Sequence, residues 1–332
     1  MFEKVSGDEF MDNKYIGHQL QMYGVEEFRL EGGKGGGMKM YNVRNCTGLQ
    51  FYVCPDRCAD IPRLSFKGDN MGFLSACGYV APQYYERGGT GFLKSFNAGF
   101  LTTCGLTATG APCVDDDEET AMHGVIGNAP CDNIAHWIEN DEIHIKAIVR
   151  EATIFSHQME LIREYIVPLY ENVIYLNDTI RNVGSMKSPV QVLYHCNMGY
   201  PLLSENAVLD IPAVKSVPRD AHAAEGFDKW AEIEKPQRGY AEMCYFHTLE
   251  GKPEVSIYNK DIKKGLKICY DTEELGYFTQ WKMMGEYDYA LGLEPGNCEP
   301  DGRNVMREKG ILEFLEPGQE RKQSIKFVFE EK

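Results

Sequence analysis

The sequence predicts an all-β protein of many mostly antiparallel strands with few short helices. Apolar residues recur with a period of two rather than 3.6 along most of the chain. Helical patterns are few, and strands do not alternate with helices as βαβ units require. Many strands joined by short turns are typical of a β-sandwich or a β-barrel.

The clearest strand is residues 143–150, in which Ile143, Ile145, Ala147 and Val149 alternate with mostly polar neighbours. This alternation indicates a strand with one buried face. Further segments with a strand pattern are 173–183, 189–195, 311–315 and 324–330.

Turn residues separate these strands, and one helix interrupts them. Asn182 and Gly184 mark the turn after 173–183, and Pro317 with Gly318 suits a turn before the last strand. The best helical candidate is 222–235, although Gly226 lies inside it and Pro236 ends it.

Composition bounds the class of protein. Hydrophobic residues make up 43% and charged residues 25% of the 332 residues, which suffices for a sizeable core. We expect a single domain over 1–332, with 1–40 as an N-terminal extension or flap. A net charge of −16 without a dense Lys/Arg cluster disfavours nucleic acid as a partner. It suits a neutral small molecule better than a phosphorylated one. A monomer or a homodimer is expected from base rates.

Compartment follows from segments that the sequence lacks. The first residues, MFEKVSGDEFMDNKYIGHQ, contain no apolar stretch of a signal peptide, and no run of 18 apolar residues occurs. We therefore expect a cytoplasmic protein that does not enter a membrane. The eleven cysteines have no repeated spacing. Buried free thiols explain Cys54 and Cys58 better than a zinc site, so no metal is predicted.

Two biased stretches have ordinary explanations. GGKGGG at 32–37 lacks the spacing of a phosphate-binding loop and indicates a flexible loop. DDDEE at 115–119 indicates a solvated loop, with a cation site as the alternative.

Five segments combine glycine, histidine, asparagine, tryptophan or a carboxylate with apolar surroundings. They are residues 91–112, 121–130, 193–203, 277–285 and 290–298. In the first, dense glycine allows the backbone to approach a ligand, and Lys94 and Asn97 are the strong polar groups. A tightly packed pair of strands explains this segment equally well.

The second and third segments contribute histidines. His123 precedes Gly124, a context in which a structural role is common. His195 and Asn197 share one face of a strand that Pro201 breaks. They should lie beside a loop, where functional side chains often occur.

The last two segments carry sugar-binding chemistry. Gln280, Trp281 and Lys282 place an amide, an indole and an amine together, which suits the apolar faces and hydroxyls of a sugar. A core tryptophan with solvated neighbours is the alternative. Glu294 ends an apolar strand before Pro295, and a carboxylate buried there needs a partner. A surface glutamate remains the alternative.

At His123, His195 and Glu294 the sequence resembles the aldose 1-epimerase (galactose mutarotase) superfamily. The resemblance rests on the order of motifs: His-Gly, NVG followed by PVQVLYH, GLEPGNC, and a PG-x-E turn before the last strand. An aldose 1-epimerase-like branch looks closer still, since it shares CPDRCADI, TCGL, QWKMMG and LEPGNC. The resemblance spans roughly residues 50–330.

The resemblance implies a β-supersandwich and a mechanism that needs neither metal nor cofactor. Glu294 would act as the base on the anomeric hydroxyl, and His195 would be the acid at the ring oxygen. His123 would orient the sugar. Such chemistry needs one acidic and one basic side chain of the protein that act on the same sugar ring.

The sequence departs from the better-known members at one motif. An arginine-containing N-R-x-x-N stretch is replaced by the region of Lys94 and Asn97, and lysine donates as a point rather than a fork. Arg57 and Arg303 are candidates to line the pocket or to form structural ion pairs, as is Asp60. Asp228 is a weak candidate for the substrate aspartate.

Three functions therefore compete. The first is an isomerase that interconverts anomers of a free sugar, with His195 and Glu294 facing each other across a cleft one sugar ring wide. The second is a non-catalytic carbohydrate-binding or sensor protein, in which Gln280, Trp281 and Lys282 matter most. The third is an epimerase or lyase for an acidic sugar held by Lys94 with Arg57 or Arg303.

Overall fold

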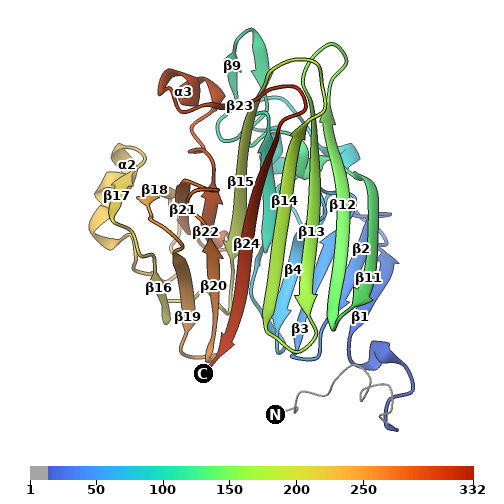
Figure 1. The fold of residues 1–332 in the computed structure, drawn as a ribbon. Helices are drawn as coiled ribbons and strands as arrows, with labels where there is room; N and C mark the ends of the chain where they lie inside the picture. The colour runs from blue at the N-terminus through green and yellow to red at the C-terminus, as the bar shows by residue number, and fades with distance from the viewer. Residues whose placement is uncertain (1–13) are drawn as a thin grey trace.

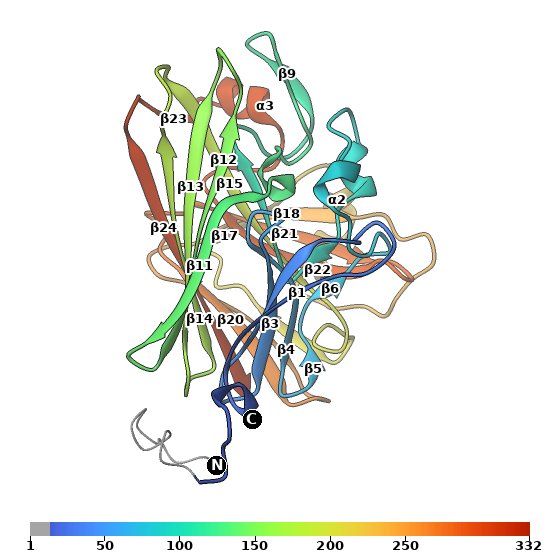
Figure 2. The ribbon, with the colours of Figure 1, turned by 90° about the vertical axis from the view of Figure 1, so that its right-hand side faces the viewer.

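Alternating sequences form two large antiparallel sheets that pack face to face in the computed structural model, which describes residues 14–332 (Figure 1; Figure 2). Within those residues, the larger sheet has 12 strands in the order β1-β2-β3-β4-β8-β15-β22-β21-β18-β17, with β5 beside β4 and β23 beside β15. Its strands are β1 Gly24–Arg29, β2 Lys39–Arg44, β3 Leu49–Cys54, β4 Asp60–Phe66, β5 Asp69–Asn70, β8 Leu101–Leu106, β15 Ser188–Met198, β17 Lys215–Pro218, β18 Met243–Thr248, β21 Tyr277–Met284, β22 Tyr289–Gly296 and β23 Glu313–Leu315.

The second sheet has eight strands over the same described range, in the order β11-β12-β13-β14-β24-β20-β19-β16. They are β11 Cys131–Glu139, β12 Glu142–Ala152, β13 Gln158–Pro168, β14 Val173–Asn182, β16 Ala207–Asp210, β19 Glu254–Asn259, β20 Lys264–Tyr270 and β24 Glu320–Glu331.

Short elements complete the described chain. Two small strand pairs are β6 Phe73–Leu74 with β7 Ala98–Gly99, and β9 Cys113–Asp115 with β10 Glu118–Thr120. The α-helices are α2 Ala221–Glu225 and α3 Arg303–Glu308. The 3-10 turns are η1 Gln19–Gln21, η2 Pro82–Tyr84, η3 Gly91–Lys94, η4 Ile126–Asn128 and η5 Phe227–Lys229.

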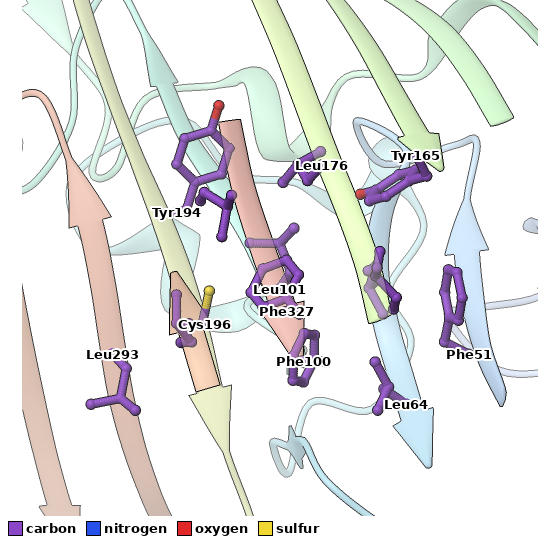
Figure 3. Packing of buried hydrophobic residues seen from close by; sticks show 14 of the residues in the cluster. Phe51, Leu64, Phe100, Leu101, Tyr165, Leu176, Tyr194, Cys196, Leu293 and Phe327 are labelled. Carbon is purple, nitrogen blue, oxygen red and sulfur yellow. The ribbon is translucent and has the colours of Figure 1, made fainter. Parts of the chain in front are cut away.

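One continuous core fills the space between the sheets. The second sheet contributes Tyr165, Leu176 and Phe327, and the larger sheet contributes Tyr194 and Cys196 from β15 (Figure 3). Because side chains alternate along a strand, the odd-numbered residues of β15 point to the opposite face of the larger sheet. That outer face is where His195 lies.

A buried ion network also joins the sheets. Arg163 of β13, with a fully buried side chain, contacts Asp60 of β4 and Asp178 of β14, each at 2.7 Å. The hydroxyl of Tyr194 donates to Asp178 at 2.7 Å. Asp60, a candidate pocket residue in the sequence, is therefore a structural partner of Arg163.

The structure confirms the all-β class and the two-residue period. The segments at 143–150, 173–183, 189–195 and 324–330 lie in β12, β14, β15 and β24, with differences of a few residues at their ends. The helix expected over 222–235 is wrong. It stops at Glu225, because Gly226 follows, and only the short turn η5 continues.

The N-terminal region and the domain count have separate outcomes. β1 adds Gly24–Arg29 to the edge of the larger sheet by pairing with β2, so this part of 1–40 is not a detached flap. Residues 1–13 lie outside the described residues. The single domain over 1–332 stays a prediction. No helix in the described range is both long and apolar enough to cross a membrane.

Candidate active site

A cavity of about 510 Å³ lies over strands β15, β22 and β21 of the larger sheet. This volume is within the roughly 300–1,000 Å³ typical of small-molecule sites. Its lining combines polar groups with aromatic and aliphatic ones: Phe92, Leu93, Phe96, Gly110, Ala111, Met122, His123, His195, Arg219, Glu242, Cys244, Thr279, Trp281, Glu294, Pro300 and Asp301.

His195 and Glu294 face each other on neighbouring strands. The register pairs Leu193 with Gly296 and Cys196 with Leu293, which places His195 opposite Glu294. Side chains in such cross-strand positions touch. Nε2 of His195 lies 3.2 Å from Oε1 of Glu294, and the two residues are only 5% and 1% exposed. The expected gap of one sugar ring between them is therefore wrong, because directly opposed residues of adjacent strands are in contact.

Gly292 makes room for the Glu294 carboxylate. Both residues lie on the same face of β22, two positions apart. A Cβ atom on Gly292 would lie 2.2 Å from Oε1 of Glu294 and 2.9 Å from Cβ of Trp281. Glycine at this position lets the carboxylate lie flat against its own strand, beside Trp281 of β21.

The backbone before η4 directs His123 into the cavity. His123 has φ 55°, a left-handed conformation that is uncommon for a residue with a side chain. Two hydrogen bonds hold it there: its N–H donates to the Gly110 carbonyl at 2.8 Å, and its carbonyl accepts from Gly105 at 3.1 Å. The His123 and His195 rings then lie with centroids 5.7 Å apart.

Aromatic rings flank both histidines. Phe92 and Phe96 stack with centroids 4.8 Å apart. Phe92 contacts His123 at 5.0 Å between centroids, and Phe96 contacts His195 at 5.1 Å. Trp281 also contacts His195, at 5.4 Å between centroids. Such rings offer flat apolar surfaces of the kind that pack against the C–H faces of a sugar ring.

A polar group of side chains lies beyond Trp281. The indole N–H of Trp281 donates to Glu242 at 2.7 Å. Arg219 donates to Asp220 at 3.0 Å and to Sγ of Cys244 at 3.0 Å, and its second nitrogen contacts Glu242 at 3.4 Å. The one arginine that lines the cavity is thus balanced by two carboxylates, which makes this end of the cavity polar without a net positive charge.

Burial sets the protonation of the opposed pair. It lowers the pKa of His195 to about 3, an effect that nearby His123 increases, and it lowers the pKa of His123 to about 4. Burial also raises the pKa of Glu294 well above its usual range, and Glu242 adds to this. Burial thus disfavours the charged form of both side chains and favours a pair without net charge, with the proton on Glu294.

The structure brings together four of the residues singled out in the sequence. His123, His195, Trp281 and Glu294 line the same cavity, although they come from a loop and three strands. Asn197 lies next to them on β15 but does not line the cavity. It is fully buried, and its amide donates to the carbonyl of His195 at 2.9 Å.

Gln280 and Lys282 lie on the wrong face of β21, which corrects the prediction that they accompany Trp281. Strand pleating directs them opposite to Trp281, toward the loop that follows α2. Gln280 donates to the carbonyl of Trp230 at 2.7 Å and contacts His247 at 3.0 Å. Lys282 pairs with Glu234 at 2.8 Å.

The remaining basic candidates also have partners elsewhere. Arg57 is buried and donates to the carbonyls of residues 80, 95 and 127. Arg303 is buried and forms an ion pair with Asp115 at 2.7 Å. The acidic run at 115–119 therefore contributes at least one carboxylate to a buried ion pair. Lys94 is mostly exposed and contacts Glu86. None of the three lines the cavity, and neither does Asn97 or the exposed Asp228.

Several lining residues have no signal in the sequence. Arg219 and Glu242 flank irregular segments without a motif, and they meet only because β17 and β18 pair beside β21. For the segment that contains Phe92 and Phe96, the prediction named only the polar residues as ligands. Their four-residue spacing around a 3-10 turn could have indicated a shared face.

Comparisons with known proteins agree with this architecture. A family model described as "Domain of unknown function (DUF4432)" matches residues 35–328. A solved structure of a candidate aldose 1-epimerase from Klebsiella pneumoniae is 26% identical with a TM-score of 0.87, over 92% of this chain and 83% of that chain. No curated protein matches the sequence.

Two more distant structures share the fold. A galactose mutarotase-like protein from Clostridium acetobutylicum is 14% identical with a TM-score of 0.67, over 94% of this chain and 100% of that chain. A galactose 1-epimerase from Lactobacillus acidophilus is 15% identical with a TM-score of 0.63, over 93% and 99%. The fold implied by the sequence resemblance is thereby confirmed.

Proposed function

Since the chain belongs to the family described as a domain of unknown function (DUF4432), whose description gives no activity, we propose a function from its site: it interconverts the anomers of a free sugar. The observation that carries this proposal is the contact of His195 with Glu294 at 3.2 Å inside the cavity. An acid and a base side by side, next to flat aromatic surfaces, suit proton transfer at the two oxygens bonded to the anomeric carbon, the hydroxyl and the ring oxygen.

The reaction needs two coupled proton transfers. Glu294 takes the proton of the anomeric hydroxyl while His195 gives a proton to the ring oxygen, and the C1–O5 bond breaks. The open-chain aldehyde turns about its C1–C2 bond. Glu294 then returns its proton to the aldehyde oxygen, O5 closes onto C1, and His195 recovers its proton, which yields the other anomer. Atoms and charges balance without a co-reactant.

The resting protonation adds one step. Burial favours the proton on Glu294 and a neutral His195, which is the state of the pair with the open-chain aldehyde rather than with the closed ring. The pair must therefore reach the state with a charged carboxylate and a protonated imidazole before ring opening, and Nε2 of His195 lies 3.2 Å from Oε1 of Glu294. Sugar hydroxyls that hydrogen-bond to the carboxylate would favour it, since such bonds stabilise the charged form.

The rival functions have less support. The acidic-sugar hypothesis relied on Lys94, Arg57 or Arg303, and these side chains lie outside the cavity lining in other bonds. Arg219 does line the cavity, but two carboxylates balance its charge. A purely binding role would not need an isolated acid–base pair buried together. The cavity itself serves either role, so the distinction must be tested.

The test is anomer exchange followed by saturation-transfer NMR, with and without the protein, on pure α-anomers of neutral and acidic aldoses. We expect acceleration by the wild type and a loss of roughly 10²–10⁴-fold in Glu294→Gln and in His195→Asn. His247→Asn is the matched control, since His247 is also a buried histidine but does not line the cavity. It should retain the rate.

The outcomes separate the candidates. Line broadening that shows binding, without exchange of any sugar, would establish the sensor role instead. Exchange that both site variants retain would remove His195 and Glu294 from the mechanism.

A further inference from the structure

The segment before His123 lines the cavity with apolar side chains, although polar, sugar-binding groups were predicted there. Phe92 and Phe96 form a stacked pair, and Met122 packs against them. The polar side chains of the same segment do not line the cavity: Lys94 contacts Glu86, and Asn97 is buried elsewhere. This wall therefore offers no side-chain hydrogen bond until His123.

The wall lies directly beside His195, since the Phe96 and His195 rings have centroids 5.1 Å apart. In the proposed reaction His195 reaches the ring oxygen of the sugar. The carbon bonded to that oxygen on the side away from C1 carries the exocyclic C6 group. With the C6 group directed toward Phe96, that group would meet the surface formed by Phe92, Phe96 and Met122.

Another part of the cavity lining has the complementary, polar character. Glu294 serves the anomeric hydroxyl; on β21 Thr279 lies opposite Glu294, and Trp281 lies opposite Gly292, two residues earlier on β22. Beyond Trp281 come Glu242 and Arg219, which can both accept and donate hydrogen bonds. The hydroxyls on C2 and C3 would thus meet polar groups, while the C6 end meets apolar ones.

From this polarity gradient we infer that the sugar carries a methyl group at C6, which makes it a 6-deoxyhexose. The inference rests on the proposed function, because that function fixes which end of the ring faces His195. A C6 hydroxyl pressed against the wall would lose its bonds to water without replacement, whereas a methyl group would be buried favourably.

Matched sugars test this directly. The exchange experiment is run on D-fucose against D-galactose, D-quinovose against D-glucose, L-fucose against L-galactose and L-rhamnose against L-mannose, pairs that differ only in the C6 hydroxyl. For the best pair we expect kcat/KM to favour the deoxy sugar by about tenfold to a hundredfold. Parent hexoses exchanged as well as their deoxy partners would overturn the inference while the proposed function stands. Exchange of no sugar would overturn both.

Variants of the wall give a second readout. Met122→Gln adds an amide of similar size, so it should reduce the preference for the deoxy sugar by about tenfold. Met122→Leu keeps the wall apolar and should retain the preference. An unchanged preference in an active, folded Met122→Gln protein would contradict the assignment of this wall to C6.

Discussion

Replacing Gly292 with alanine should displace the Glu294 carboxylate and press on Trp281. The new Cβ would lie 2.2 Å from Oε1 of Glu294, whereas ordinary contacts of this kind begin at 3.4 Å. The carboxylate must therefore move by about 1 Å, away from its present contact with His195. The moving atom is the end of a side chain, so the strand itself can persist.

The size of the effect follows from that displacement. A misplacement of about 1 Å in a catalytic group can reduce the rate by about 10²-fold. The 2.9 Å approach to Cβ of Trp281 adds some strain, which we expect to cost on the order of 1 kcal/mol, as for mild overpacking. Activity should thus fall far more than stability.

The assay is kcat/KM for anomer exchange, together with its pH profile and the urea midpoint of unfolding. A change in the pH profile would indicate that the proton-sharing pair itself has moved, which a general loss of fold would not produce. Gly265→Ala is the control, because its Cβ would meet backbone of β19 at 2.9 Å in the second sheet, far from the cavity. Full activity with an unchanged pH profile in Gly292→Ala would refute the reasoning.

Three further predictions concern the core, the cavity and pH. Arg163→Met leaves Asp60 and Asp178 as buried, unpaired carboxylates, so the urea midpoint should reveal a loss of about 3–5 kcal/mol; a loss below 1 kcal/mol would show that the network is dispensable. Sugar binding should change tryptophan fluorescence through Trp281, and Trp281→Phe should abolish most of that change; a signal that survives would place the sugar elsewhere. Because burial raises the pKa of Glu294, the folded protein keeps a proton that the unfolded chain releases above its ordinary pKa of 4.5, so stability from this group is lost as pH rises. The Tm of Glu294→Gln should therefore gain on that of the wild type as the pH rises above 4.5, and a constant difference would contradict the raised pKa of Glu294.

The strands could be predicted because their signal is local. Residues 143–150 alternate so regularly that one face had to be buried, and β12 follows that pattern. The same rule, applied to β21, would have separated Trp281 from Gln280 and Lys282, since neighbours on a strand face opposite sides. The prediction grouped these three residues because their side chains suit a sugar, and it did not apply the alternation of side chains along a strand. Gly226 had likewise already indicated the end of the short helix.

Other parts of the site depend on contacts that no local pattern contains. The sequence left Arg303 as either a pocket residue or a structural ion pair, and Asp115, far away in the chain, pairs with it. Glu242 and Arg219 reach the cavity only through the pairing of β17, β18 and β21. A charged residue is therefore assigned to a site or to an ion pair only when its distant neighbours are known.

The position of β24 has a consequence for biosynthesis. This strand lies between β14 and β20 in the interior of the second sheet, yet it is translated after every other strand of that sheet (Figure 1). Until residues 320–331 leave the ribosome, β14 and β20 each present an unpaired edge, and the core beneath them is open. A nascent or prematurely terminated chain would expose two unpaired strand edges to other chains. Chaperone dependence and inclusion-body formation should therefore be greater for chains in which β24 is not yet complete.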